Sequence, residues 1–349
     1  VLLYSLIFLT FIAMKVKKIK EYSKTPTESI SNQYTTKKHS FKEPGIKIVV
    51  GTRGTGKSYT TAKIMLEAKR EKLFDVTYFI TPTFDSNKAH WSQFNISENN
   101  VFYPNRDAIQ KVIKRIEQDR DEFENYLVEE EIYKRFKKET KTVSSISRME
   151  VENLNDYINM GYVGNDGQMN SRITKPEWKY NNVSGEIRPP TSLLVMDDVL
   201  GSTALSQSEY FTKLCIMNRH IAPLSEAFDN RQALGCSVII LAQSYSAQQG
   251  IPRACRENAT DLILFKNKQK DAMKKIKDEL AGAVDEQEFE VAYNFATKGK
   301  HDNLCISFNC DCPTKRYRKN LNEFIIFLSL IHISEPTRLL SISYAVFCL

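Results

Sequence analysis

The chain has 349 residues, 42% hydrophobic and 26% charged, which is enough for a substantial core in one elaborated α/β domain or in two domains. Its net charge of +7, from 49 basic and 42 acidic residues, permits a polyanionic partner without requiring one. The seven cysteines are odd in number and mostly scattered, so they exclude a disulfide framework and indicate reduced, intracellular thiols.

The N-terminal part divides into two segments. Residues 1–13 are mostly apolar, but a membrane span needs about twenty such residues, and the lysines from Lys15 onward follow this run instead of preceding it. We therefore expect Met14 to be the true start and residues 1–13 to be untranslated upstream sequence. Residues 14–44 are rich in Ser, Thr and Lys, which predicts a flexible polar leader.

A phosphate-binding loop opens the domain that we expect over residues 45–328. Residues 51–58 read GTRGTGKS, which matches the G-x-x-x-x-G-K-[ST] pattern of P-loop NTPases. A β-rich run, 46–50, precedes it, and a helix is expected over 59–73. Such a loop turns its N–H groups toward a polyphosphate, the lysine neutralises charge, and the serine hydroxyl binds Mg²⁺. The expected ATP-binding residues are Gly51, Thr52, Arg53, Gly54, Thr55, Gly56, Lys57, Ser58 and Tyr59.

The middle of the chain differs in character from the rest. A strand is predicted over 76–81, and from about residue 85 to 189 the sequence becomes charged and largely helix-forming. Apolar residues three to four apart predict an amphipathic helix over 107–141. Residues 162–190, rich in Gly and Asn, indicate a loop. We interpret residues 85–189 as a helical insertion.

Apolar runs return after the insertion. Residues 192–196 and 237–242 are continuous apolar runs, typical of parallel strands covered on both faces. Two further strands, 261–265 and 303–308, flank a lysine-rich helix over 269–280. Alternating strands and helices predict a three-layer α/β sandwich with a mainly parallel sheet. Residues 329–349 resemble a translated sequencing-adapter tail, and we expect them to lie outside the fold.

Polar residues follow two of these strands directly. Asp197 and Asp198 end one run, and Gln243 ends the next. Carboxylates at the carboxyl edge of a sheet meet the Mg²⁺ held beside a phosphate loop. We expect Asp197 and Ser58 to bind Mg²⁺, Asp198 to orient the attacking water, and Gln243 to contact the γ-phosphate and that water. Asp198 as a solvated acid and Gln243 as an ordinary strand end are the alternatives.

Several motifs together resemble one family. They are LLVMDD at 193–198, NRH at 218–220, QSY at 243–245, REN at 256–258, TPTFDSN at 81–87 and RYRKNLNEF at 316–324. With the phosphate loop, this set is similar to the FtsK/HerA-type genome-packaging ATPases of large eukaryotic DNA viruses and polinton-like viruses, the poxvirus-type packaging family. The resemblance covers about residues 45–328, least clearly in the insertion, and implies a RecA-like P-loop fold of the additional-strand type.

The resemblance also implies partners. Motors of this kind form rings, commonly hexamers, around double-stranded DNA, and an arginine reaches into the neighbouring site to stabilise phosphoryl transfer. Arg256 is the candidate for this finger, with Arg253 and Arg219 as alternatives. The basic residues that we consider for a DNA channel, unless they form only a solvated helix face, are Lys266, Lys268, Lys270, Lys274, Lys275 and Lys277.

We therefore predict an ATP-hydrolysing DNA translocase that packages a viral genome into a capsid, with ATP and Mg²⁺ as cofactors. Its expected partners are DNA, further copies of itself and a capsid or portal-region protein, without a membrane. We expect it at the intracellular site of viral assembly, or in the virion. The alternatives are a membrane-anchored assembly ATPase of the filamentous-phage type, a P-loop kinase and a scaffold that binds nucleotide without hydrolysis.

Overall fold

A computed structural model provides the structure of the chain. It describes residues 13–18, 44–85, 91–142, 151–181, 185, 187–200, 205, 208–226, 228, 233–245, 250–267, 270–310 and 313–328. The expected tail, 329–349, most of the expected leader and Lys268 lie outside the described residues.

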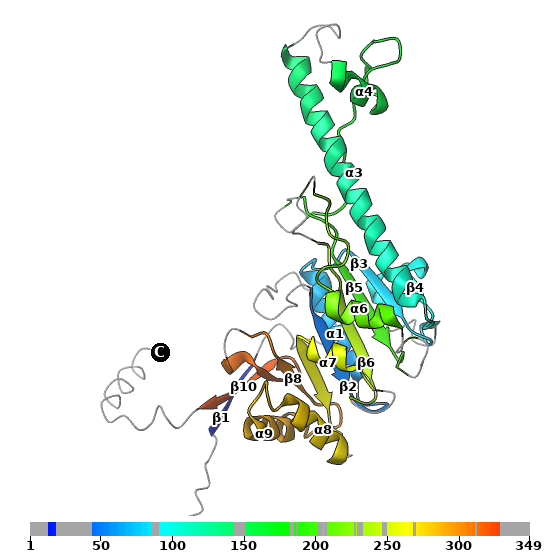
Figure 1. The fold of residues 1–349 in the computed structure, drawn as a ribbon. Coiled ribbons are helices and arrows are strands. Elements are labelled where there is room, and N and C mark those ends of the chain that lie inside the picture. The colour runs from blue at the N-terminus through cyan, green and yellow to red at the C-terminus, as the bar shows by residue number, and fades with distance from the viewer. Residues whose placement is uncertain are drawn as a thin grey trace, which may run out of the picture.

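Within the described residues, one mixed sheet of ten strands forms the centre of the molecule, in the order β1-β10-β9-β8-β7-β2-β6-β5-β3-β4 (Figure 1). The strands are β1 (Ala13–Lys18), β2 (Ile46–Val50), β3 (Val76–Ile80), β4 (Val101–Phe102), β5 (Ser192–Asp197), β6 (Ser237–Ala242), β7 (Asp261–Phe265), β8 (Asn303–Ser307), β9 (Tyr317–Lys319) and β10 (Glu323–Leu328).

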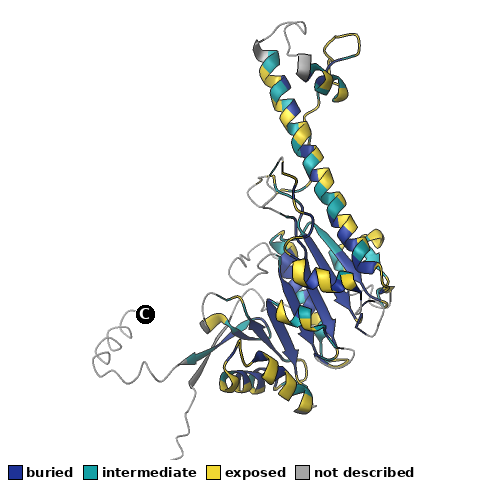
Figure 2. Cartoon of the chain, viewed as in Figure 1, coloured by how far each residue is buried: buried dark blue, intermediate teal, exposed yellow. Residues whose placement is uncertain are grey.

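The sheet has a parallel half and an antiparallel half. Strands β7, β2, β6, β5, β3 and β4 pair in parallel, whereas β8, β9, β10 and β1 continue from β7 as antiparallel neighbours. The five parallel strands that the sequence predicts all form within one residue of the expected bounds. The central strands are buried on both faces, as their continuous apolar sequences require (Figure 2).

Helices cover both faces of the sheet and complete the three-layer α/β fold. The α-helices are α1 (Lys57–Arg70), α3 (Ala108–Thr142), α4 (Val151–Asn159), α6 (Glu209–Met217), α7 (Arg253–Glu257), α8 (Lys270–Leu280) and α9 (Glu286–Ala296); the 3₁₀ helices are η3 (Ser92–Phe94), η4 (Glu98–Asn100) and η6 (Pro313–Lys315). Helices α3, α6, α7, α8 and α9 pack on one face. Helix α1 packs on the other face, together with Trp91.

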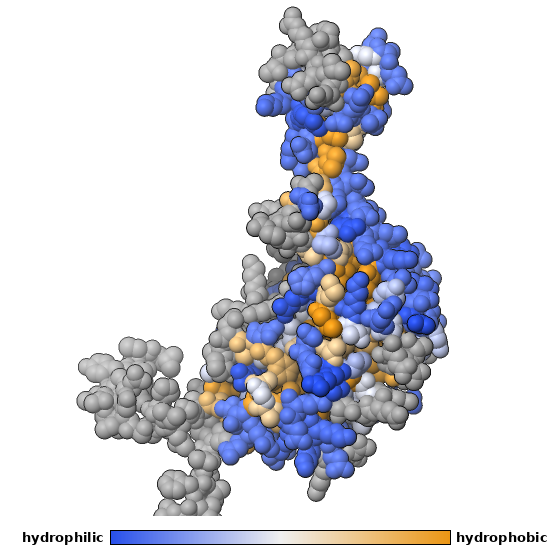
Figure 3. All heavy atoms as spheres, viewed as in Figure 1, coloured by the Kyte–Doolittle hydropathy of each residue, from blue (hydrophilic) through white to orange (hydrophobic). Residues whose placement is uncertain are grey.

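Helix α3 confirms the predicted amphipathic helix and extends far beyond the sheet (Figure 1). Its 35 residues make it about 50 Å long at 1.5 Å per residue. The distal end and α4 share a small core in which Phe136, fully buried, contacts Tyr157 and Tyr162 with ring centroids 5.0 Å apart. We call this part the arm, residues 126–142 and 151–173. Its visible surface is mainly hydrophilic (Figure 3).

The structure differs from the sequence predictions in several segments. Residues 14–18 belong to strand β1, which pairs with β10, although the sequence predicts a flexible leader there. Val101 and Phe102, inside the expected insertion, add a strand to the sheet edge. Strands β9 and β10 and helix α9 were not predicted. Strand β9 has only three residues and pairs with β8 and β10, and β10 pairs with β9 and β1. Helix α9 packs on one face of the sheet, so these elements depend on their tertiary partners.

The expectation of reduced thiols is wrong for two cysteines. Cys215 on α6 and Cys255 on α7 are joined by a disulfide, with their Cα atoms 4.8 Å apart. Both are buried where the two helices pack on the same face of the sheet. Their separation of 40 residues gave no indication of this contact in the sequence.

Candidate functional site

The phosphate loop joins β2 to α1 and adopts a backbone that only glycine takes up easily. Gly54 has φ 79° and Gly56 has φ 106°, both in the left-handed region that disfavours other residues. A Cβ at Gly51 would come within 2.6 Å of the Thr55 hydroxyl and 2.9 Å of Phe265. The glycine spacing of the motif is therefore a steric requirement of this loop.

The Lys57 side chain makes hydrogen bonds to two backbone carbonyls of the phosphate loop. Its Nζ donates to the carbonyl oxygens of Gly51, at 2.7 Å, and Thr52, at 3.2 Å. Burial lowers the pKa of Lys57, while the negative charges of Asp197 and Asp198 oppose that change. An ammonium group held by carbonyl oxygens beside two carboxylates is placed to exchange these contacts for a bound polyphosphate.

Strands β5 and β6 bring the predicted polar residues to the same edge as the loop. Asp197 pairs with Leu241, and Val50 pairs with Ala242, so the three strand ends are level. Asp197 is buried as the last residue of β5. Asp198 is exposed with φ 56°, and its Oδ1 accepts a 3.0 Å hydrogen bond from Gln243 Nε2. The structure thus joins the acid pair to the glutamine.

These groups surround one pocket of about 1160 Å³. The predicted residues that line it are Arg53, Gly54, Gly56, Lys57, Ser58, Tyr59, Asp197, Asp198 and Gln243. Gly51, Thr52 and Thr55 do not line it, but the first two hold Lys57 through their carbonyls. The Ser58 hydroxyl and Asp197 carboxylate are hard oxygen donors at the same pocket, and this donor set fits Mg²⁺.

Nine further residues line this pocket without having been predicted as site residues. They are Thr60, Lys63, Thr83, Leu241, His301, Asp302, Asn303, Asn320 and Asn322. Thr83 lies in the TPTFDSN segment and both later asparagines lie in RYRKNLNEF, so the motifs were noted without a role for these side chains. Strands β8 and β9 bring the last four residues to the loop from far along the chain.

Arg256 lies elsewhere and is held within its own chain. Its guanidinium makes two hydrogen bonds to the Glu279 carboxylate, at 2.8 and 3.0 Å, and another to the Ile251 carbonyl. The group also lies 5.4 Å from the centroid of the Tyr245 ring. Arg256 does not line the pocket beside the phosphate loop. Its fixed contacts position it as an anchor between α7 and α8.

The two alternative arginines are more accessible. Arg253 is 82% exposed and pairs with Glu257 at 2.6 Å. Arg219 is also exposed, just beyond the end of α6. Of the lysines considered for DNA, Lys277 is paired with Glu290 at 2.6 Å.

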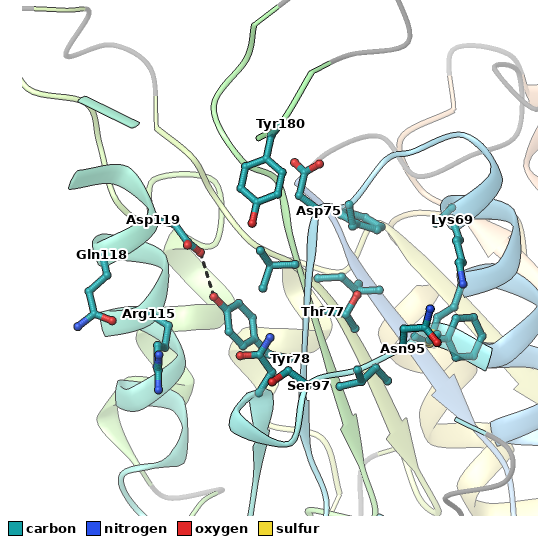
Figure 4. Close-up of a pocket in the computed structure, with 18 of the residues that line it drawn as sticks. Lys69, Asp75, Thr77, Tyr78, Asn95, Ser97, Arg115, Gln118, Asp119 and Tyr180 are labelled. Atoms are coloured by element: carbon teal, nitrogen blue, oxygen red, sulfur yellow. Dashed lines mark hydrogen bonds between the residues drawn. The ribbon is translucent and has the colours of Figure 1, made fainter. Parts of the chain in front are cut away.

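A second cavity, of about 460 Å³, lies at the edge of the sheet between α1 and α3 (Figure 4). It exists because β4 pairs with β3 only at Phe79 and Ile80, which leaves the start of β3 without an outer strand. The Tyr78 hydroxyl donates to Asp119 at 3.1 Å, and burial raises the pKa of both groups. None of the residues predicted for the nucleotide site lines this cavity.

Comparison with known proteins gives distant structural likenesses. No family model matches, and no curated protein matches. The genome packaging NTPase B204 from Sulfolobus turreted icosahedral virus 2, in complex with AMPPCP, is 13% identical with a TM-score of 0.40, over 79% of this chain and 96% of that one. The pCW3 conjugation coupling protein TcpA, with ATPγS, is 13% identical with a TM-score of 0.38, over 86% of this chain and 65% of that one.

The chain therefore spans less than two thirds of the coupling protein that it resembles. At these identities and scores, the function has to be inferred from the residues of this chain. Among the described residues, no helix combines the length and the apolar character that crossing a bilayer requires.

Proposed function

We propose that this chain is an ATPase that hydrolyses Mg²⁺-bound ATP and uses it to move double-stranded DNA into a viral capsid. The observation that supports ATPase activity is that Lys57, Asp197 and Asp198 all line one pocket. Phosphoryl transfer to water requires a positive charge that binds the phosphates, a carboxylate that binds the metal ion and a second carboxylate that orients the water.

Each residue has a distinct part in this reaction. Lys57 and the loop N–H groups bind and orient the phosphates. Ser58 and Asp197 would hold Mg²⁺, which would neutralise phosphate charge. Asp198 accepts a hydrogen bond from the attacking water and orients it. Gln243 donates a 3.0 Å hydrogen bond to the Asp198 carboxylate. In the proposed reaction the same amide contacts the γ-phosphate and responds to it.

The DNA-packaging part of the proposal is supported by the motif resemblance of residues 45–328, and the net charge of +7 is compatible with it. We propose that the chain acts as a ring, hexameric by that resemblance, around DNA and beside a capsid or portal-region protein. Its place of action would be the site of viral assembly in the host cell. A translocase must hold every phosphate that it passes, so its DNA binding should depend on salt and not on sequence.

The test of the central proposal is ATP turnover by the full chain with and without double-stranded DNA. We expect DNA to stimulate turnover and Lys57→Ala to lower it at least about a hundredfold, as loss of one preorganised charge does. Lys69→Ala, on the same helix, serves as the control. Wild-type turnover in Lys57→Ala would refute the ATPase site. Turnover without any DNA response would favour the assembly ATPase or the kinase.

The neighbouring-subunit arginine needs a separate test. We propose Arg256 for this role, which would require it to leave Glu279 when subunits assemble. Arg256→Ala subunits mixed with Lys57→Ala subunits should then regain part of their activity, because some interfaces combine an intact loop with an intact arginine. If confirmed mixed rings show no rescue, while Arg253→Ala or Arg219→Ala mixtures do, one of those residues has the role.

A further inference from the structure

The nucleotide pocket has two sides with different chemistry. Relative to β2, the strands β6 and β5 lie on one side and β7 and β8 on the other. The carboxylates that act on the terminal phosphate belong to the β5–β6 side. A nucleotide with its γ-phosphate there directs its nucleoside toward the β8 side, where the pocket continues.

Five polar residues form that other side, and we call them the amide wall: His301, Asp302, Asn303, Asn320 and Asn322. The wall touches the phosphate loop directly, because His301 Nδ1 lies 3.1 Å from the Thr55 carbonyl oxygen. The His301 ring also lies 3.7 Å from the position that a Cβ on Gly56 would occupy. The wall and the loop therefore form one continuous surface.

Hydrogen bonds within the wall hold two of its residues in place. Asn320, with φ 53°, donates through Nδ2 to Asp302 at 2.8 Å and accepts the Asn303 N–H at 3.0 Å. The Asp302 carboxylate also accepts the Gly299 N–H at 3.0 Å. Although burial alone would raise the pKa of Asp302, these hydrogen bonds and Lys319 hold it below its usual value. The polar groups of Asp302 and Asn320 are therefore occupied by hydrogen bonds within the wall, and these bonds hold the backbone of Asn303 in place.

Asn303 is the exception within the wall. The residue is only 3% exposed, yet its Oδ1 has no hydrogen-bond partner among the described residues. A buried amide oxygen without a donor is costly, and native structures rarely leave one unexplained. The last torsion of asparagine is broad, so a ligand donor in the pocket can draw this oxygen toward itself.

We propose that Asn303 reads the base of the bound nucleotide and selects a 6-aminopurine. Its Oδ1 would accept a hydrogen bond from the exocyclic amine of adenine. A 6-oxopurine offers an oxygen at that position, which leaves the amide oxygen unpaired and opposed by a second acceptor. Sites that hydrogen-bond a ligand group reject analogues lacking it far more strongly than apolar pockets do. This inference rests on the proposed nucleotide site and assigns its specificity.

The experiment is calorimetric titration of the full chain with ADP and with IDP, in the presence of Mg²⁺. These two ligands differ only at the purine 6-position and the adjoining ring proton, and neither requires hydrolysis. We expect the wild type to bind ADP at least about tenfold more tightly than IDP, in keeping with one buried hydrogen bond. In Asn303→Leu the two affinities should come within about twofold, mainly through weaker ADP binding.

Asn294→Leu, the same substitution on the exposed face of α9, should retain the wild-type ratio. Equal wild-type binding of ADP and IDP would overturn the role of Asn303 and leave the nucleotide site intact. A parallel loss of both affinities in Asn303→Leu would also overturn it, since that residue would then only shape the pocket. Absence of binding by either ligand to the wild type would refute the proposed site itself.

Discussion

Asp197 and Asp198 are adjacent in the chain but occupy different environments. Asp197 is buried in the last position of β5, whereas Asp198 is exposed and turns out of the strand with φ 56°. That change of backbone direction lets both carboxylates face one pocket, which two successive residues in an extended strand cannot do. The separate roles proposed for the two acids rest on this turn.

The two acids should therefore respond differently to the same substitution. Asp198→Asn keeps an Oδ1 for Gln243, so ATP should bind normally while turnover falls at least about a hundredfold. Asp197→Asn should instead weaken Mg²⁺-dependent ATP binding, on the order of tenfold. Binding titrations over a range of Mg²⁺ concentrations, beside turnover assays, separate these effects. Reversed phenotypes would exchange the two assignments.

Glu67 on α1 predicts a dependence of stability on pH. Burial raises its pKa from 4.5 to about 7, with Glu71 adding to the rise and Arg70, at 3.3 Å, opposing it. The folded state thus holds a proton that the unfolded state loses near pH 4.5. Its stabilising contribution is complete below that pH and is lost as the pH rises through about 7.

Replacing Glu67 with glutamine should remove this loss of stability at high pH. At pH 8 we expect Glu67→Gln to be more stable than the wild type by about 2 kcal/mol, because glutamine needs no proton to remain neutral. The two proteins should converge as the pH is lowered toward 4.5. Urea unfolding at several pH values measures this difference, and a constant difference at every pH would contradict the assignment.

At the scale of elements, the arm carries a core separate from that of the sheet. Its cluster of Ile132, Phe136, Tyr157, Tyr162 and Val163 is distinct from the two clusters on the faces of the sheet. Arg135 ties α3 to α4 through Asn153, at 2.8 Å, and Asp156, at 3.1 Å. A small core on one long helix can open without unfolding the body.

Phe136→Ala should therefore unfold the arm locally. Loss of this fully buried ring is expected to cost about 3–5 kcal/mol, more than so small a core can absorb. Hydrogen exchange should become faster in α4 and the distal half of α3, while ATP turnover stays near that of the wild type. Val128→Ala, on the same helix at a residue 46% exposed, is the control. Uniformly faster exchange in the sheet would show that the arm and body unfold together.

At the scale of the whole molecule, a buried ion network joins the two halves of the sheet. Asp261 on β7 pairs with Lys47 on β2 at 2.5 Å and accepts a hydrogen bond from Ser307 on β8. Arg318 on β9 donates to Ser307 at 2.7 Å and lies 3.8 Å from the same carboxylate. The network thus connects the parallel strands β2 and β7 with the antiparallel strands β8 and β9.

Removing the central charge should destabilise the entire fold. Asp261→Asn leaves Lys47 and Arg318 without the carboxylate between them, a change expected to cost about 3–5 kcal/mol. Glu122→Gln makes the same substitution in the exposed pair with Lys179 and should cost less than about 1 kcal/mol. Urea unfolding provides both values. Equal small effects would mean that the network does not join the two halves.

The sequence by itself determined those elements that depend on interactions between residues close together in the chain. The glycine spacing of residues 51–58 dictates the phosphate loop, and continuous apolar runs predict the parallel strands that end in Asp197 and Gln243. Because parallel strands end at one edge of a sheet, the sequence by itself predicts those residues near the loop. The same reasoning predicts α3 from its apolar spacing.

Tertiary structure alone decided the other side of the pocket and much of the sheet. Strand β9 has only three residues and forms by pairing with β8 and β10, so its sequence does not reveal it, and with it Asn320 remains unplaced. Asn303 begins a predicted strand, but its buried, unpaired oxygen depends on neighbours brought from distant segments. The contacts of Arg256 with Glu279 and the bond between Cys215 and Cys255 likewise result from helix packing. Contacts between distant segments depend on the free energy of the complete fold, so a local sequence pattern does not predict them.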